Sequence, residues 1–339
     1  MTIPSAFDPV TTMDYHTAGE PFRIVTGGVP PLDGEDVPAR RRFAAANLDW
    51  IRQLLVNEPR GHADMYGCFV TPPDDADADL GVVFFHNAGY STACGHGTIA
   101  LVTWALESGV VPVTGPQTTV VVDAPSGRLT ATATVAGDRV TAVRVTNVAS
   151  YVEATAVDLH IDGTDVQVDI AFGGAFYAVL DAAAVDCAVV ADDLSTLITR
   201  GRTIKAAIER ERTVAHPTAE DIGGIYGVIF VDRTHHDGAT LRQRNLAIFA
   251  DGEVDRSPTG SGVSARLALL DAAGTLARGA DLVTSGIAGL EFTGRVVDEA
   301  DVAGRRAVIT EVTGSAHRTG RHEFLLDPHD PLGTGFLLR

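Results

Sequence analysis

Residues 94–97 (Cys-Gly-His-Gly) and 259–262 (Thr-Gly-Ser-Gly) are the two segments of this chain whose residue types and spacing could do chemistry. Each segment opens a run of small and apolar residues, and at one constant offset the two runs end together, at Gly109 and Gly274. The sequence therefore indicates a duplication, with one polar side chain at the head of each of two buried helices. The first head is Cys94 and the second is Thr259, and this asymmetry bears on the chemistry.

The amino end of a helix presents unpaired N–H donors and a partial positive charge, which together bind anions. Glycines inside the two segments let the backbone approach a ligand closely. We expect both heads to face one cleft, where the amides of Gly95 and His96 and those of Gly260 and Ser261 would hold a carboxylate. The same field favours the thiolate of Cys94 and makes it a usable base near neutral pH. The alternative is that glycine-rich helix starts are common and that the cysteine is merely small.

Two further residues lie close to these heads in sequence. Asp255 precedes Thr259 by four residues, across a turn fixed by Pro258. This aspartate either receives a cationic group of the ligand or serves as a loop or capping residue. His96 could hydrogen-bond the ligand or the thiol of Cys94, or it could be a satisfied turn histidine.

Other histidines give little support for a metal centre. His235 and His236 precede Asp237 in a polar stretch that we predict to be a solvated turn. The HExxH, paired CxxC and phosphate-loop motifs are absent, as is a strand–GxGxxG–helix pattern for a nicotinamide cofactor. We therefore expect no metal and no cofactor.

Composition restricts the class of protein. A chain of 339 residues suits two domains, and a net charge of −18 argues against a nucleic acid or an anionic membrane as partner. No apolar run is long enough for a transmembrane helix, and the first residues do not form a secretory signal. The three cysteines are too few and odd in number for a disulfide framework, so a cytoplasmic location is expected. Cys68 and Cys187 are predicted to be inert core residues of strands.

The hydrophobic pattern predicts many short strands and few helices. Strands are predicted at residues 81–86, 118–123, 129–135, 140–145, 166–172, 176–180, 227–231 and 240–249. Helices are predicted at residues 40–55, 97–108, 194–210 and 262–273, and the second and fourth are apolar nearly all round. The predicted class is α+β, with two pseudo-symmetric strand-rich halves that each wrap one buried central helix. The halves are predicted as residues 1–162, completed by the tail 318–339, and residues 163–317, with a polar boundary near 158–165.

Several longer pieces of sequence together resemble the proline racemase family, which has the diaminopimelate-epimerase-like fold. The pieces that match lie at residues 13–21, 58–62, 64–67, 94–98, 173–178 and 255–260. The resemblance implies an enzyme without cofactor that acts on a small imino acid, and a homodimer is plausible for this fold. In the racemases two cysteines face opposite sides of the substrate Cα, and the family's aspartate and histidine positions match Asp255 and His96 here.

This chain departs from the racemase pattern at Thr259, where the second cysteine is expected. Ala175, where racemases usually have asparagine, and Ser261, where threonine is more usual, are further differences. A threonine hydroxyl is too weak an acid to exchange protons at neutral pH, whereas racemisation needs an exchangeable proton on both faces. The resemblance therefore implies dehydration of trans-3-hydroxy-L-proline, with Cys94 as the one base. The alternatives are epimerisation of 4-hydroxyproline, racemisation of proline, binding of an imino acid without turnover, and metal-dependent hydrolysis.

Overall fold

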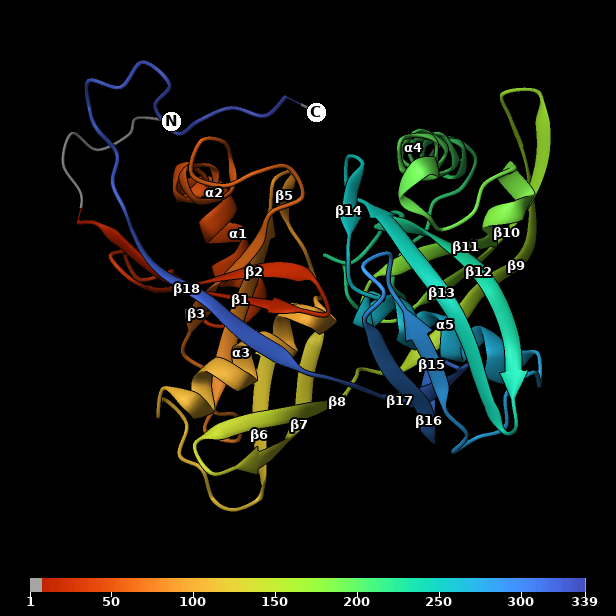
Figure 1. Cartoon of the computed structure of the whole chain (residues 1–339), viewed down its shortest axis with the longest axis horizontal. Coiled ribbons are helices and arrows are strands. Elements are labelled where there is room, and N and C mark those ends of the chain that lie inside the picture. The colour runs from red at the N-terminus through yellow and green to blue at the C-terminus, as the bar shows by residue number, and fades with distance from the viewer. Residues whose placement is uncertain (1–7, 339) are drawn as a thin grey trace. The chain divides into compact units, whose positions relative to one another are not determined.

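The computed structural model describes residues 8–338 and comprises two compact units. Unit 1 is the chain up to Val143 together with the segment from Ser315 onward, and unit 2 is Arg144–Gly314. Both units are rich in strands and contain few helices, so the chain has the expected α+β class (Figure 1). No helix in the described range 8–338 is long and apolar enough to cross a membrane.

Unit 1 is built around a mixed sheet. Its strands are β1 (Val10–Thr17), β2 (Glu20–Gly27), β3 (Tyr66–Thr71), β4 (Leu80–His86), β5 (Gly89–Tyr90), β6 (Gln117–Ala124), β7 (Gly127–Ala136), β8 (Arg139–Thr146, which crosses the division in sequence) and β18 (Ala316–Phe324). Its helices are α1 (Val37–Asn47), α2 (Asp49–Val56) and α3 (Gly95–Glu107). The pairs β2·β3 and β4·β6 are parallel, and the pairs β1·β2, β1·β18, β3·β4, β4·β5 and β6·β7 are antiparallel.

Unit 2 closes its strands into a ring. Its strands are β9 (Ser150–Ile161), β10 (Thr164–Phe172), β11 (Phe176–Asp181), β12 (Gly227–Asp237), β13 (Thr240–Phe249), β14 (Glu253–Asp255), β15 (Leu282–Ser285), β16 (Glu291–Val302) and β17 (Arg305–Gly314). Its helices are η1 (Ala182–Val185), η2 (Ala191–Asp193), α4 (Leu194–Glu211) and α5 (Gly260–Ala272). Pairing runs from β9 through β10, β11, β12, β13, β15, β16 and β17 and returns to β9.

The two units repeat one topology, as the duplicated helix heads predicted. In each unit an antiparallel pair, β3·β4 or β12·β13, is flanked by two parallel pairs. The crossover of the first parallel pair carries α1 and α2 in unit 1 and α4 in unit 2. The crossover of the second pair carries α3 in unit 1 and α5 in unit 2, so the helices headed by Cys94 and Thr259 occupy equivalent places.

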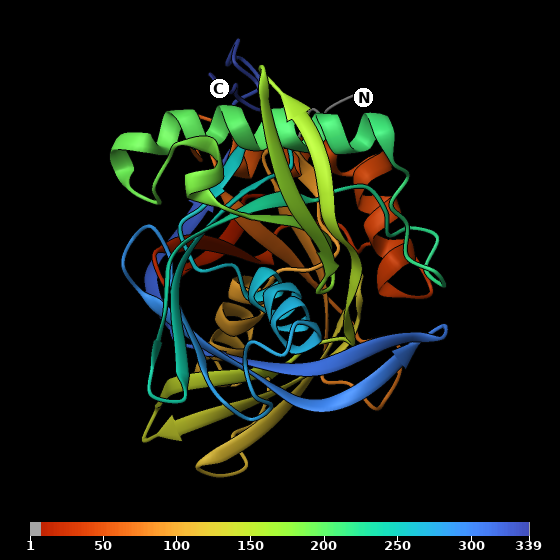
Figure 2. The same cartoon turned by 90° about the vertical axis from the view of Figure 1, so that its right-hand side faces the viewer.

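Helices α3 and α5 are the buried central helices of their units. Every residue of α3 from His96 to Leu106 is buried, and α5 is buried from Gly260 to Leu270 except at Arg266. Figure 2 shows α5 enclosed by the strands of unit 2, with α4 lying outside them. An apolar surface all round a helix requires such enclosure, because no side is left for water.

Three details differ from the sequence-based expectations. The predicted helix 40–55 is two helices, because Leu48 leaves helical geometry between α1 and α2, with φ −121° and ψ 13°. The polar stretch 158–165, where we predicted the boundary between the halves, contains the turn of the β9·β10 hairpin. Asp162 and Gly163 have positive φ there, as such tight turns require. Cys187 is not a buried strand residue: it is partly exposed and follows the left-handed Asp186 after η1.

Candidate active site

Cys94 caps the amino end of α3 through its sulfur. The backbone is extended at this residue, and Sγ accepts a hydrogen bond from the amide of Gly97 at 3.2 Å. Nε2 of His96 lies 3.3 Å from Sγ, and both side chains are almost fully buried. A sulfur atom that accepts from a helix-end amide beside an imidazole is held where negative charge is stabilised, as a thiolate requires.

The neighbours of Cys94 restrict what can lie beside the sulfur. A side chain at Gly97 would place its Cβ 2.6 Å from Sγ and 2.4 Å from the Phe22 ring, so only glycine fits there. The ring of His96 makes edge contacts with the rings of Tyr66 and Phe22, at centroid separations of 5.0 and 5.8 Å. The amide of Gly95 has no hydrogen-bond partner among residues 8–338, which leaves it available to a ligand.

Thr259 heads α5 in a strained conformation. Its φ of 64° and ψ of 93° lie in the left-handed region, which a β-branched residue rarely adopts. Its Oγ1 is buried and has no hydrogen-bond partner in the described part of the chain. Strain and an unpartnered buried hydroxyl at one residue are typical of a functional position.

The first amides of α5 are also without partners. Thr259 makes no side-chain cap, and the N–H groups of Gly260, Ser261 and Gly262 have no acceptor among the described residues. These residues are buried, and buried N–H groups are nearly always paired in folded proteins. This helix end therefore has the properties of an anion site.

This helix end is supported by two residues that were not predicted as site residues from the sequence. The Tyr177 hydroxyl on β11 is 2.7 Å from Oγ of Ser261, and both residues are buried. A Cβ at Gly173 would lie 2.2 Å from the carbonyl oxygen of Ser261, so the loop before β11 can approach α5 only as glycine. The motif at 173–178 contained both residues, but only the tertiary contacts give them these positions.

Asp255 ends β14 and leads into the turn before α5. The residue is buried, and its Oδ1 accepts a hydrogen bond from the amide of Ser257 at 2.8 Å. Oγ of Ser257 in turn accepts from the amide of Thr259 at 3.1 Å. These two hydrogen bonds fix the turn, so Asp255 has a structural role that does not depend on a ligand.

Cys68, Cys187, His235 and His236 give no support for a further site among residues 8–338. Burial raises the pKa of the Cys68 thiol, and burial together with Asp193 raises the pKa of Cys187, so both thiols favour the neutral form. His235 and His236 are exposed near the end of β12, which extends further than predicted. Within residues 8–338 no group of three or more His, Cys, Asp or Glu side chains could hold a metal ion.

Comparison with known proteins places the chain in a family. The family model described as proline racemase matches residues 12–337, so the chain belongs to the proline racemase family. A protein from Bacillus cereus named trans-3-hydroxy-L-proline dehydratase is 48% identical, and the match covers 97% of this chain and 98% of the relative. A protein from Burkholderia multivorans named 3-hydroxyproline 2-epimerase is 46% identical, with 97% of this chain and 98% of the relative covered.

A solved structure agrees with the family assignment. A hydroxyproline epimerase from Agrobacterium vitis, with trans-4-hydroxy-L-proline bound, superposes with a TM-score of 0.90 at 30% identity. The comparison covers 98% of this chain and 96% of that protein. The diaminopimelate-epimerase-like fold expected from the resemblance is therefore the fold of this chain.

Proposed function

We propose that this protein dehydrates trans-3-hydroxy-L-proline to Δ1-pyrroline-2-carboxylate without a cofactor. The observation that carries the proposal is the asymmetry of the helix heads: Cys94 has a sulfur held by an amide and beside His96, whereas the Thr259 hydroxyl has no partner among the described residues. The name of the Bacillus cereus relative supports the same activity.

In this mechanism Cys94 thiolate removes the proton from the substrate Cα. The electron pair of the C–H bond forms a double bond between Cα and C3 as the C3–O bond breaks. In trans-3-hydroxy-L-proline the hydroxyl is opposite the carboxylate, hence on the same face as the Cα hydrogen. The new thiol on Cys94 can therefore protonate the departing hydroxyl, which leaves as water and regenerates the thiolate. The enamine product then tautomerises to the cyclic imine.

The helix-end amides would stabilise the transition state. Removal of the Cα proton places negative charge on the carboxylate. Each hydrogen-bond donor directed at such charge increases the rate by about 10²–10³-fold. The amides of Gly95, Gly260 and Ser261 are without partners among residues 8–338, which supports their assignment to this role. We assign the same role to the His96 amide and propose that Asp255 receives the ring ammonium.

Thr259 would contact the opposite face of the substrate as a hydrogen-bonding group only. Inversion at Cα needs a group on that face that can give a proton to the carbanion. A hydroxyl without a hydrogen-bonded base does not readily exchange its proton, which disfavours epimerisation. The name of the Burkholderia multivorans relative makes 3-hydroxyproline 2-epimerase the second candidate, together with epimerisation of 4-hydroxyproline and racemisation of proline.

The proposal is tested with purified protein, trans-3-hydroxy-L-proline and, separately, trans-4-hydroxy-L-proline. Imine formation is coupled to an imino acid reductase, and the Cα configuration of remaining substrate is followed by chiral chromatography. Imine from the 3-hydroxy substrate, with no inversion of either substrate, is the expected result. Inversion of either substrate without imine would replace the dehydratase with an epimerase, and the absence of both products would refute the assignment.

A further inference from the structure

Unit 1 contains a cavity that shares no residue with the Cys94 helix end. We call it the sheet-end pocket; it has a volume of about 700 Å³ and lies where the parallel strands β2 and β3 end. Its walls include Val25, Leu32, Arg40, Phe69, Val70 and Trp104. A cavity of this size with apolar walls and a few polar groups is typical of small-molecule sites.

Arg40 brings unused hydrogen-bond donors to this pocket. The residue is 8% exposed, and Nη1 donates to the carbonyl oxygen of Pro72 at 2.8 Å and lies 3.3 Å from Oδ1 of Asp74. The one other contact of the guanidinium in the described chain is a long one, 3.5 Å from Nη2 to the carbonyl oxygen of Glu35. A guanidinium has five N–H donors, so at least two remain without a partner among the described residues.

Trp104 contributes a second donor from α3. Its side chain lines the pocket and the residue is 7% exposed, yet its indole N–H has no acceptor in the part of the chain that the structure describes. The indole N–H of a buried tryptophan usually finds a partner. Two side chains with N–H donors that the described residues leave unpaired thus meet at one cavity, where a ligand could supply the acceptor atoms.

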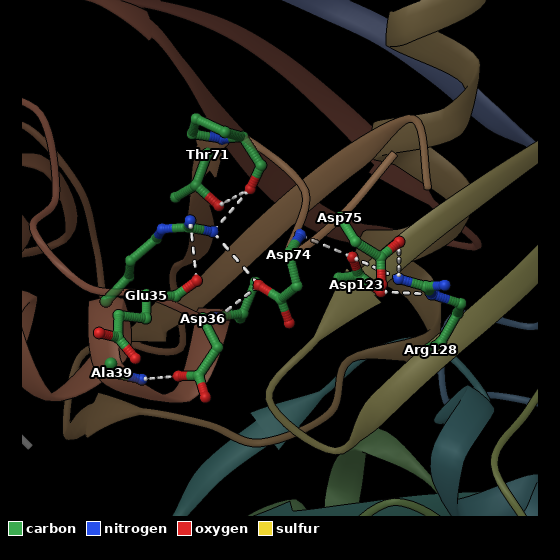
Figure 3. Close-up of polar contacts among 11 residues, drawn as sticks. Glu35, Asp36, Ala39, Thr71, Asp74, Asp75, Asp123 and Arg128 are labelled. Carbon is green, nitrogen blue, oxygen red and sulfur yellow. Dashed lines mark hydrogen bonds and ion pairs between the residues drawn. The ribbon is translucent and has the colours of Figure 1, made fainter. Parts of the chain in front are cut away.

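The charges around Arg40 decide which kind of acceptor fits. Asp33 lines the pocket, and Asp74 already pairs with the guanidinium. Figure 3 shows Asp36 on one side of Asp74 and Asp123 on the other, where an oxygen of Asp123 accepts from the Asp74 amide. Burial is the main cause that raises the pKa of Asp74, and the negative charges of Asp123 and Asp36 raise it further. The negative charges of these aspartates would repel a second anion at Arg40, whereas they would not repel an uncharged acceptor.

We propose that the sheet-end pocket binds an uncharged, largely apolar small molecule that carries a carbonyl oxygen. The carbonyl oxygen accepts from Arg40 or Trp104, and the apolar body packs on Val25, Phe69 and Val70. The site is separate from the Cys94 head, because Trp104 follows Cys94 by about 15 Å along α3 at 1.5 Å per residue. The proposal does not depend on which imino acid the protein converts.

The test uses prodan, an uncharged naphthalene ketone whose emission reports binding, with the full-length protein. The chain has two tryptophans, so Trp50→Phe leaves Trp104 as the one indole whose emission a bound probe can quench. We expect saturable prodan binding with quenching of Trp104. In the protein that keeps Trp50, Trp104→Phe and Arg40→Met should each weaken prodan binding by about two- to tenfold, as expected for one lost hydrogen bond.

Thr26→Trp provides a blocking variant, because Thr26 is exposed and lines the pocket, so a bulky side chain fills it without disturbing the core. This variant should lose prodan binding and keep the activity of the parent protein. Val113→Trp is the matched control, because Val113 is exposed in unit 1 and is not among the lining residues. Prodan binding that persists in Thr26→Trp, or tighter binding of the anionic probe anilinonaphthalene sulfonate than of prodan, would overturn the proposal.

Discussion

Replacing Thr259 with cysteine tests the asymmetry of the two helix heads. A hydroxyl about as weakly acidic as water is exchanged for a thiol, whose ordinary pKa of about 8.5 is far lower. The difference of roughly seven pKa units corresponds to about 10 kcal/mol in the free energy of ionisation. We therefore expect Thr259→Cys to invert hydroxyproline at Cα, in addition to any remaining dehydration.

The structure predicts that this variant folds. Thr259 has a φ of 64° and a buried hydroxyl without a partner among the described residues. Such strain costs about 1–3 kcal/mol, and cysteine is not β-branched and tolerates an apolar contact better than a hydroxyl does. The free energy of unfolding should stay equal or rise by about 1 kcal/mol, which corresponds to a Tm increase of roughly 2–4 °C for a unit of this size.

The assay follows the Cα proton by NMR in deuterium oxide and the two configurations by chiral chromatography. Thr259→Ser is the matched control, since it also removes the β-branch but supplies no thiol. Inversion in the cysteine variant and none in wild type or the serine variant would agree with the reasoning. Wild-type inversion, or a folded cysteine variant that binds substrate and never inverts it, would refute the one-base mechanism.

Three further predictions concern the contacts of individual side chains. Cys94→Ser should lower kcat by at least about 10³-fold with Tm unchanged, because a hydroxyl can still accept from the Gly97 amide but is a poor base; full activity would contradict this. Tyr177→Phe should raise the KM for the 3-hydroxy substrate by about two- to tenfold through the lost bond to Ser261, and an unchanged KM would remove this tyrosine from substrate binding. Hydrogen bonds and ion pairs with Arg278 and then Arg306 lower the pKa of Asp271, so their stabilisation is present above the ordinary carboxyl pKa and is lost as pH falls through the lowered value. Asp271→Asn should therefore lower the free energy of unfolding by about 1–2 kcal/mol at pH 7, and a difference that does not shrink below about pH 4 in urea titrations would exclude these ion pairs as the cause.

Patterns that are local in sequence predicted the elements well. The strand at residues 240–249 was predicted to the residue, and the helices headed by Cys94 and Thr259 begin two residues earlier than predicted. Alternation and helical periodicity are set by short stretches of chain, so they can be read without knowledge of the fold. The break at Leu48 was missed because the apolar spacing continues across it while the backbone does not.

The sequence by itself determined the two helix heads, their difference in carrying Cys94 and Thr259, and the class of fold, because glycine spacing and apolar runs are local properties. Only the tertiary structure decided that Tyr177 meets Ser261, that Gly173 lies on the first turn of α5, and that the hydroxyl of Thr259 has no partner among the described residues. The sheet-end pocket likewise joins Arg40 and Trp104 from elements far apart in sequence. These contacts depend on strand register and on which crossover covers which strand, and residue spacing along the chain does not specify either.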